Sequence, residues 1–183
     1  MPHLLKRHPD SRSTEVHSIT VNAIRAGKPG AVLVSYVVEG AMNGLRIPAA
    51  LSPARADRLW EHTCFELFIR PPEGEAYFEF NFSPSMQWAA YRFARWRSGL
   101  TNIEMPAPAV DFHVAERAEL VAVLDLSSVP GLPTNQPWRA NITTVIEQTN
   151  GEKSVWALQH APGKADFHHA DGFVLDLPVP QQK

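Results

Sequence analysis

Residues 64–96 read CFELFIRPPEGEAYFEFNFSPSMQWAAYRFARW, and three runs within this stretch decide the fold. In CFELFI, YFEFNF and WAAYRFARW, side chains of two kinds alternate with a period of two. Such alternation is typical of a β-strand with two different faces. The breaks between the runs, PPEGE and SPS, are turn sequences rich in proline, glycine and serine. The stretch therefore predicts a meander of three neighbouring antiparallel strands.

Outward from this meander, the chain shows further short strands separated by linkers that contain glycine or proline. We expect them at 19–23, 31–38, 45–47, 110–114, 120–126, 138–147, 154–160 and 173–177. The strand at 31–38 is apolar on both faces, which predicts burial on both sides. Short helices are expected only at 54–60 and 114–120. About ten strands without an amphipathic helix predict an all-β fold, a two-sheet antiparallel β-sandwich of jelly-roll or immunoglobulin-like type.

The length of 183 residues fits one domain, with 44% hydrophobic and 20% charged residues as in ordinary globular proteins. We see no internal repeat and no shift in composition that would mark a boundary. The sequence therefore predicts a single β-sandwich domain at 16–178. The N-terminal segment 1–15 and the last residues, 181–183, are expected to be flexible.

Charge and cysteine content exclude several classes of partner and site. The formal net charge is −2, so we expect neither nucleic acid nor an anionic membrane as partner. One cysteine excludes an internal disulfide and a Cys-rich zinc site, and we expect no metal and no cofactor. The only apolar run near the N-terminus is Leu4-Leu5, whereas a secretory signal needs about 7–15 apolar residues. We therefore expect a cytoplasmic protein.

The best candidate site lies in the meander, on the faces opposite the apolar side chains. Glu66, Glu79 and Asn81 all belong to these polar faces, and a hairpin would bring them within roughly 5–8 Å of one another. Paired carboxylates can serve as acid and base or bind sugar hydroxyls or a hard cation. The competing interpretation is an ordinary solvated sheet face. Two like charges on adjacent strands destabilise a sheet, which favours a ligand site, and a nearby Arg92 could offset them.

Tryptophans give a second indication, since the chain contains 5 of them. Trp88 and Trp96 are an even number of residues apart and would share a strand face with Arg92, forming a lane on which a sugar ring could stack. Trp60 lies in an expected loop, where binding residues are common. The competing interpretation places these large rings in the core. The candidate ligand-binding residues are thus Trp60, Glu66, Glu79, Asn81, Trp88 and Arg92.

Two other features favour structural roles. Cys64 could be a nucleophile with His62 on the same strand face, but a lone cysteine is more often a buried apolar residue. His168 and His169 are adjacent, so on a strand they would point to opposite faces and could not share a metal ion.

Several motifs together resemble one family. The segments are LWEHTCFELFI at 59–69, YFEFNFSP at 77–84, QWAAY at 87–91, WAL at 156–158 and GKADFH at 163–168. They resemble bacterial DOMON-like domain proteins, relatives of family 9 carbohydrate-binding modules, over roughly 16–177. The resemblance implies a β-sandwich with a ligand site on one face or at one end. Relatives bind sugars, through two tryptophans with polar neighbours, or haem, through a methionine and a histidine.

These observations favour a non-catalytic module that binds a carbohydrate or a similar small polar ligand. A sugar-acting hydrolase or isomerase, with Glu66 and Glu79 as acid and base and His62 or His168 assisting, is the alternative. Carboxyls that face each other in a cleft would favour the enzyme, whereas solvated carboxyls beside a stacked tryptophan would favour binding. A haem-binding domain is a second alternative and requires Met42, Met86 or Met105 opposite a histidine such as His160.

We predict that the protein shows no salt-sensitive retention on immobilised DNA at physiological ionic strength. The densest basic run is Arg92, Arg95 and Arg97, which a regular strand would divide between two faces. A column of double-stranded DNA eluted with a salt gradient measures this, and retention that falls with salt would contradict the prediction.

Overall fold

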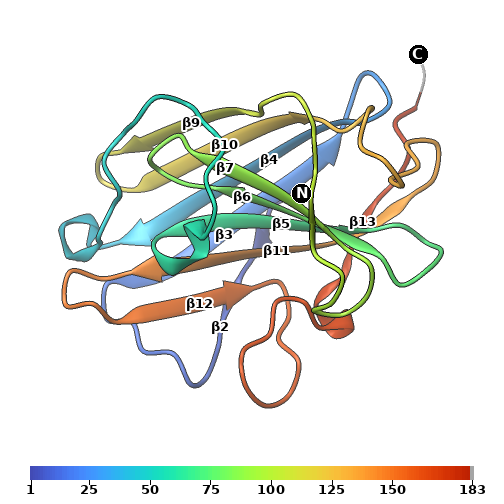
Figure 1. The fold of residues 1–183 in the computed structure, drawn as a ribbon. Coiled ribbons are helices and arrows are strands. Elements are labelled where there is room, and N and C mark those ends of the chain that lie inside the picture. The colour runs from blue at the N-terminus through green and yellow to red at the C-terminus, as the bar shows by residue number, and fades with distance from the viewer. Residues whose placement is uncertain (182–183) are drawn as a thin grey trace.

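The computed structural model describes residues 1–181 and consists of strands connected by loops and three single turns of 3₁₀ helix (Figure 1). The turns are η1 (Met42–Gly44), η2 (Leu59–Glu61) and η3 (Ala170–Gly172). None of the helices in residues 1–181 has the length and apolar character needed to span a membrane. Residues 182–183, at the end that we expected to be flexible, lie outside the described residues.

The strands form two antiparallel sheets, as the sequence predicts. Sheet 1 has the order β1 (His3–Leu4), β3 (Val16–Arg25), β4 (Ala31–Gly40), β10 (Ala118–Asp125) and β9 (Ala109–Val114). Sheet 2 has the order β2 (Lys6–Arg7), β12 (Lys153–Ala157), β11 (Trp138–Glu147), β5 (Cys64–Arg70), β6 (Tyr77–Phe82), β7 (Trp88–Phe93) and β8 (Thr101–Asn102), and β13 (Leu175–Leu177) also pairs with β11. The molecule is a two-sheet β-sandwich.

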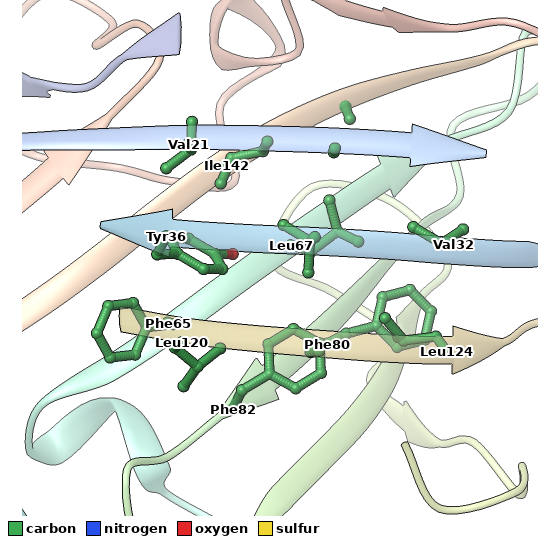
Figure 2. Packing of buried hydrophobic residues seen from close by; sticks show 14 of the residues in the cluster. Val21, Val32, Tyr36, Phe65, Leu67, Phe80, Phe82, Leu120, Leu124 and Ile142 are labelled. Carbon is green, nitrogen blue, oxygen red and sulfur yellow. The ribbon is translucent and has the colours of Figure 1, made fainter. Parts of the chain in front are cut away.

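The expected meander is present as β5, β6 and β7. Phe80 of β6 lies opposite Leu67 of β5 and Ala90 of β7, so all three side chains project from the same face of sheet 2. They pack against residues of sheet 1 such as Tyr36 and Leu120, and the strands of the two layers cross over this core in Figure 2. The hydroxyl of Tyr36 donates to the backbone carbonyl of Glu66 at 2.8 Å, which satisfies a polar atom inside the core.

Four local expectations differ from the structure. The strand at 31–38 is fully buried on one face only. The side chains of its other face are half-exposed on the outside of sheet 1. The expected helix at 54–60 is reduced to the single turn η2, and 114–120 holds the end of β9, the tight turn 115–117 and the start of β10. Residues 45–47 form an isolated bridge from Leu45 to Gln148 instead of a strand.

The N-terminal segment that we expected to be flexible pairs with both sheets. Its strand β1 adds to β3, whereas β2 adds to β12 in the other sheet. Leu5, between the two short strands, is buried in the core, and the backbone N–H of His8 donates to Val155 at 2.9 Å. Pairing that is remote in sequence gives no local signal, which is why composition suggested a loose end.

We predict that Phe80→Ala lowers the free energy of unfolding by about 3–5 kcal/mol, because the ring is 1% exposed and its removal leaves a cavity. Urea unfolding monitored by circular dichroism measures the loss. The control is Val123→Ala on the outside of sheet 1, where the side chain is 45% exposed and the loss should stay within about 0.5 kcal/mol. A loss below about 1 kcal/mol for Phe80→Ala would mean that this face of β6 is not in the core.

Candidate functional site

Sheet 2 is covered on both faces. Its outer face, directed away from sheet 1, carries a second apolar cluster formed by Phe68, Tyr77, Ala89, Tyr91, Phe93 and Phe173. Leu59 of η2 and Phe167, from the connection between β12 and β13, pack on this cluster from above. Asn141 holds that connection in place, since its side-chain N–H donates to the carbonyl of Phe167 at 3.1 Å. The polar side chains in the middle of this face, Glu66, Glu79, Asn81, Asn141 and Thr143, are therefore buried.

The two glutamates lie in the middle of this outer face. Glu66 lies between Asn81 on β6 and Thr143 on β11 in the strand register, and Glu79 lies one diagonal step away, opposite Phe68. The Thr143 hydroxyl donates to Glu66 Oε2 at 2.8 Å, and the Asn81 amide donates to Glu79 Oε1 at 2.8 Å. Glu66 is 2% exposed and Glu79 is 5% exposed. The competing interpretation of a solvated sheet face is therefore wrong.

Burial changes the protonation of both carboxyls. Burial, together with the charge of Glu79, raises the pKa of Glu66 to about 8, although the hydrogen bond from Thr143 opposes this. Burial also raises the pKa of Glu79 to about 7, against the hydrogen bond from Asn81 and the charge of Arg97. At neutral pH the pair thus retains a proton, and the two groups titrate together. The site can offer both a carboxyl donor and a carboxylate acceptor.

A cavity of about 410 Å³ opens above the two glutamates. Its walls are mostly apolar and include five aromatic side chains: Trp60, Phe68, Tyr91, Phe93 and Phe167. Trp60 is 40% exposed and meets Tyr91 edge to face, with ring centroids 6.0 Å apart. Arg58, in the left-handed conformation with φ of 63°, starts the turn that carries Trp60. Strained backbone at a non-glycine residue of this kind is concentrated at functional sites.

His168 connects the cavity wall to Glu79, whereas sequence reasoning suggests it only as an assisting residue of the alternative enzyme. The Tyr77 hydroxyl accepts from the backbone N–H of Arg97 at 3.1 Å and is 2.8 Å from His168 Nδ1, to which it can donate. That arrangement leaves the ring proton on Nε2, 3.9 Å from Glu79 Oε2. Burial and the charge of Arg97 lower the pKa of His168 to about 4, so the imidazole is neutral at pH 7.

Asp166 organises this side of the cavity. Its carboxylate accepts from the Arg97 guanidinium at 2.8 Å, from the Trp96 indole at 3.0 Å and from the backbone N–H of His168 at 3.0 Å. Burial alone would raise the pKa of Asp166, but these hydrogen bonds outweigh it and lower the pKa below its ordinary value. Arg97 itself has φ of 49°, a second non-glycine residue in the left-handed region. Asp166 therefore holds Arg97, Trp96 and the backbone of His168 in place on this side of the cavity.

The structure brings four of the six candidate residues together. Trp60, Glu66 and Glu79 line the cavity. Asn81 is fully buried beneath it and holds Glu79, and its own Oδ1 has no hydrogen-bond partner among residues 1–181. Asn81 lies opposite Glu66 in the strand register, so this unpartnered oxygen faces the strand that carries the second carboxyl.

Trp88 and Arg92 project from the other face of β7 and do not reach the cavity. Trp88 is 7% exposed in the core, and Arg92 lies beside Gly131. The expected lane between two tryptophans does not exist, because β7 ends at Phe93 and Trp96 belongs to the following turn. The hairpin register contains the missing signal: Phe82 pairs with Trp88, so the tryptophan must share the core face of the phenylalanine. Arg97, not Arg92, is the basic residue beside the carboxyls.

The remaining candidate chemistry is not brought together. Cys64 is fully buried, which raises the pKa of its thiol well above the ordinary value, and His62 contacts Glu147 at 2.7 Å instead. The three methionines proposed for haem pack against the core between the sheets, whereas His160 contacts the carbonyl of Lys6 on the surface. Among residues 1–181, no group of three or more acidic, histidine or cysteine side chains is arranged to hold a metal ion.

Comparisons with known proteins support the fold. No family model and no curated protein matches the sequence. A solved structure of a "putative carbohydrate-binding protein" from Bacteroides uniformis matches with a TM-score of 0.69 and 16% identity, covering 99% of this chain and 86% of that chain. A family 9 carbohydrate-binding module from Caldicellulosiruptor kristjanssonii matches in its glucose complex with a TM-score of 0.52 and 9% identity, covering 98% and 85%. Its cellotriose complex gives 0.56 and 8%, covering 100% and 84%. The chain thus has a fold like that of family 9 modules.

We predict that Glu79→Gln stabilises the protein at pH 8. A carboxyl whose pKa is raised from 4.5 to about 7 on folding contributes its full stability below about pH 4.5 and loses it as the pH rises through 7. The glutamine keeps the size of the side chain and removes this loss. Each 1 kcal/mol recovered should raise the melting temperature by about 2–4 °C, and the difference from wild type should vanish near pH 4.

Thermal melts between pH 4 and 8 test this, with Glu116→Gln in the exposed turn between β9 and β10 as the control. A melting temperature that is equal for wild type and Glu79→Gln at pH 8 would show that Glu79 folds without a penalty.

Proposed function

We propose that this chain is a DOMON-like, non-catalytic protein that binds a carbohydrate or a similar small polar ligand in the cavity above sheet 2. One observation carries the proposal: two buried carboxyls lie at the floor of a cavity whose apolar walls include five aromatic side chains. Its volume of about 410 Å³ lies in the range of small-molecule sites, roughly 300–1,000 Å³.

The floor suits a ligand that carries hydroxyl groups. A hydroxyl both donates and accepts, and a carboxyl pair that retains one proton does the same. The floor is already ordered before the ligand binds, because Thr143 fixes Glu66 and Asn81 fixes Glu79. Binding therefore costs little ordering of these side chains.

The walls suit the apolar side of a sugar ring. A pyranose presents C–H groups on its faces, and an aromatic ring offers a large rigid surface to them. Trp60 is the partly exposed ring at the rim, and Tyr91 supports it from below. The hydroxyl of Tyr91 donates to Asp57 at 2.7 Å, which fixes the support. The fold shared with proteins whose names and complexes concern carbohydrate agrees with this proposal.

One feature also favours the alternative, a hydrolase or isomerase that acts on a sugar. Glu66 and Glu79 face the same cavity and are not solvated, the arrangement that the sequence associated with catalysis. Raised pKa values in a cleft are typical of acid and base residues. The same carboxyls line the cavity together with Trp60, so their position is compatible with both sugar binding and catalysis.

We predict that wild type binds glucose or cellotriose and that Trp60→Ala weakens this binding at least about tenfold, through loss of ring stacking. Isothermal titration calorimetry measures the affinities. Val123→Ala, on the far side of the sandwich, is the control and should bind like wild type. Binding that is unchanged in both Trp60→Ala and Glu79→Gln would place the ligand elsewhere and refute the proposed site.

Incubation with cellotriose and with aryl glycosides separates binding from catalysis. The proposal expects the sugars to be recovered intact. Products that form with wild type but not with Glu66→Gln or Glu79→Gln would replace the binding function by the enzymatic one.

A further inference from the structure

A second hollow, of about 450 Å³, adjoins the cavity, and His168 lines both. It lies over the end of sheet 2 where β5 finishes at Arg70. Its lining includes two arginines, Arg70 and Arg95, together with Trp96 and His169. Glu75 is the one carboxylate among the lining residues, and it is exposed. The hollow therefore differs from the cavity in charge: two carboxyls form the floor of the cavity and its one arginine, Arg97, is paired with Asp166, whereas two arginines line the second hollow.

Arg70 lies in an unbalanced position. In the register of β5 and β11 it is directly opposite Arg139, and like charges at such a position destabilise a sheet. Arg139 is compensated by Asp176 at 2.8 Å and by the carbonyl of Phe173 at 3.0 Å. Arg70 makes only a long contact, 3.4 Å, to the carbonyl of Gly74. Within residues 1–181 its charge meets no carboxylate.

Arg95 and Trp96 come from the turn that follows β7. The backbone pairs of Arg95 and Ser98 close this turn, and Arg97 takes the left-handed conformation within it. Neighbouring side chains consequently serve different hollows: Trp96 lines the second, whereas Arg97 lines the first. Trp96 is fixed by its hydrogen bond to Asp166, but no ion pair or side-chain hydrogen bond holds Arg95 anywhere in the described part of the chain.

We propose that the second hollow binds an anionic group, a carboxylate or a phosphate, carried by the same ligand whose hydroxyl-bearing ring occupies the cavity. This inference rests on the proposed function and names its ligand class: an acidic saccharide or a sugar phosphate. The two guanidiniums are the donors, since arginine matches both anions with parallel N–H groups. Trp96 and Tyr77 supply apolar surface in the lining of the same hollow. An anion would also offset the like-charge contact between Arg70 and Arg139.

Matched probes test the charge requirement. Cellobiose is compared with the disaccharide in which one terminal ring is a glucuronate, and with cellobiose that carries a phosphate on the terminal ring. The three probes share a neutral ring for the cavity and differ in the group that would reach the second hollow. At low ionic strength at least one of the two acidic probes should bind about tenfold tighter than cellobiose. Raising the salt concentration to about 1 M should remove most of that difference in affinity.

Variants locate the effect. Arg95→Gln and Arg70→Gln should each reduce the advantage of the acidic probe and leave the affinity for cellobiose within about twofold of wild type. The control is Arg12→Gln, a substitution at an exposed arginine of the N-terminal segment. It removes the same charge from the protein. The carboxylate and phosphate probes together identify which anion the hollow prefers.

The outcomes separate this inference from the function on which it rests. If cellobiose binds and neither acidic probe binds more tightly, the proposed function stands and the anionic subsite is refuted. An advantage that persists in both arginine variants, or that Arg12→Gln reduces equally, would mean a general effect of net charge and refutes it as well. If no probe binds, both proposals fail.

Discussion

The alternation of β5 and β6 is the constraint on which the site depends. Successive side chains point to opposite faces of a strand, so each phenylalanine delivered to the core is followed by a residue delivered to the outer face. In most antiparallel sheets that second face meets water and the polar residues cost nothing. Here the turn η2 and the connection between β12 and β13 cover it, and Glu66 and Glu79 become buried groups. The raised pKa values and the proton shared by the pair follow from this covering.

A buried carboxyl pair is an unfavourable element in a fold. Removing like charges from water destabilises the ionised forms, and only Thr143, Asn81 and Arg97 act against this. Protonation relieves the penalty at the expense of a pH-dependent stability. A ligand hydroxyl that hydrogen-bonds to the two carboxyls would satisfy polar atoms that are buried away from bulk water. The buried pair thus lowers the stability of the ligand-free protein, and a ligand that bonds to it relieves part of this penalty on binding. Such a trade between stability and function is usual at functional sites.

Local pattern was enough to predict the sandwich, the meander and the glutamates. Period-two alternation and turn residues are short-range signals, and Trp60 followed from its position in a loop. The spacing of Trp88 and Trp96 predicts the wrong face for the Trp88 side chain, because β7 ends before Trp96. Pairing with Phe82 decides which face Trp88 occupies. Local pattern cannot place His168 and Asp166 at the site, since they lie in a loop 91 residues beyond Tyr77 and 69 residues beyond Arg97, respectively. The pairing of β1 and β2 is remote in the same sense.

That N-terminal pairing has a consequence for the behaviour of the protein among other chains. An exposed sheet edge is a template for pairing with another chain, and β3 and β12 would both present such edges if the segment were absent. By placing β1 on one edge and β2 on the other, residues 3–7 close both layers on the same side of the sandwich. Detachment of this short segment would therefore unmask two edges at once, one per sheet. With the segment in place, the outermost strand on that side of each sheet is only two residues long, and very short edge strands offer little for another chain to pair with.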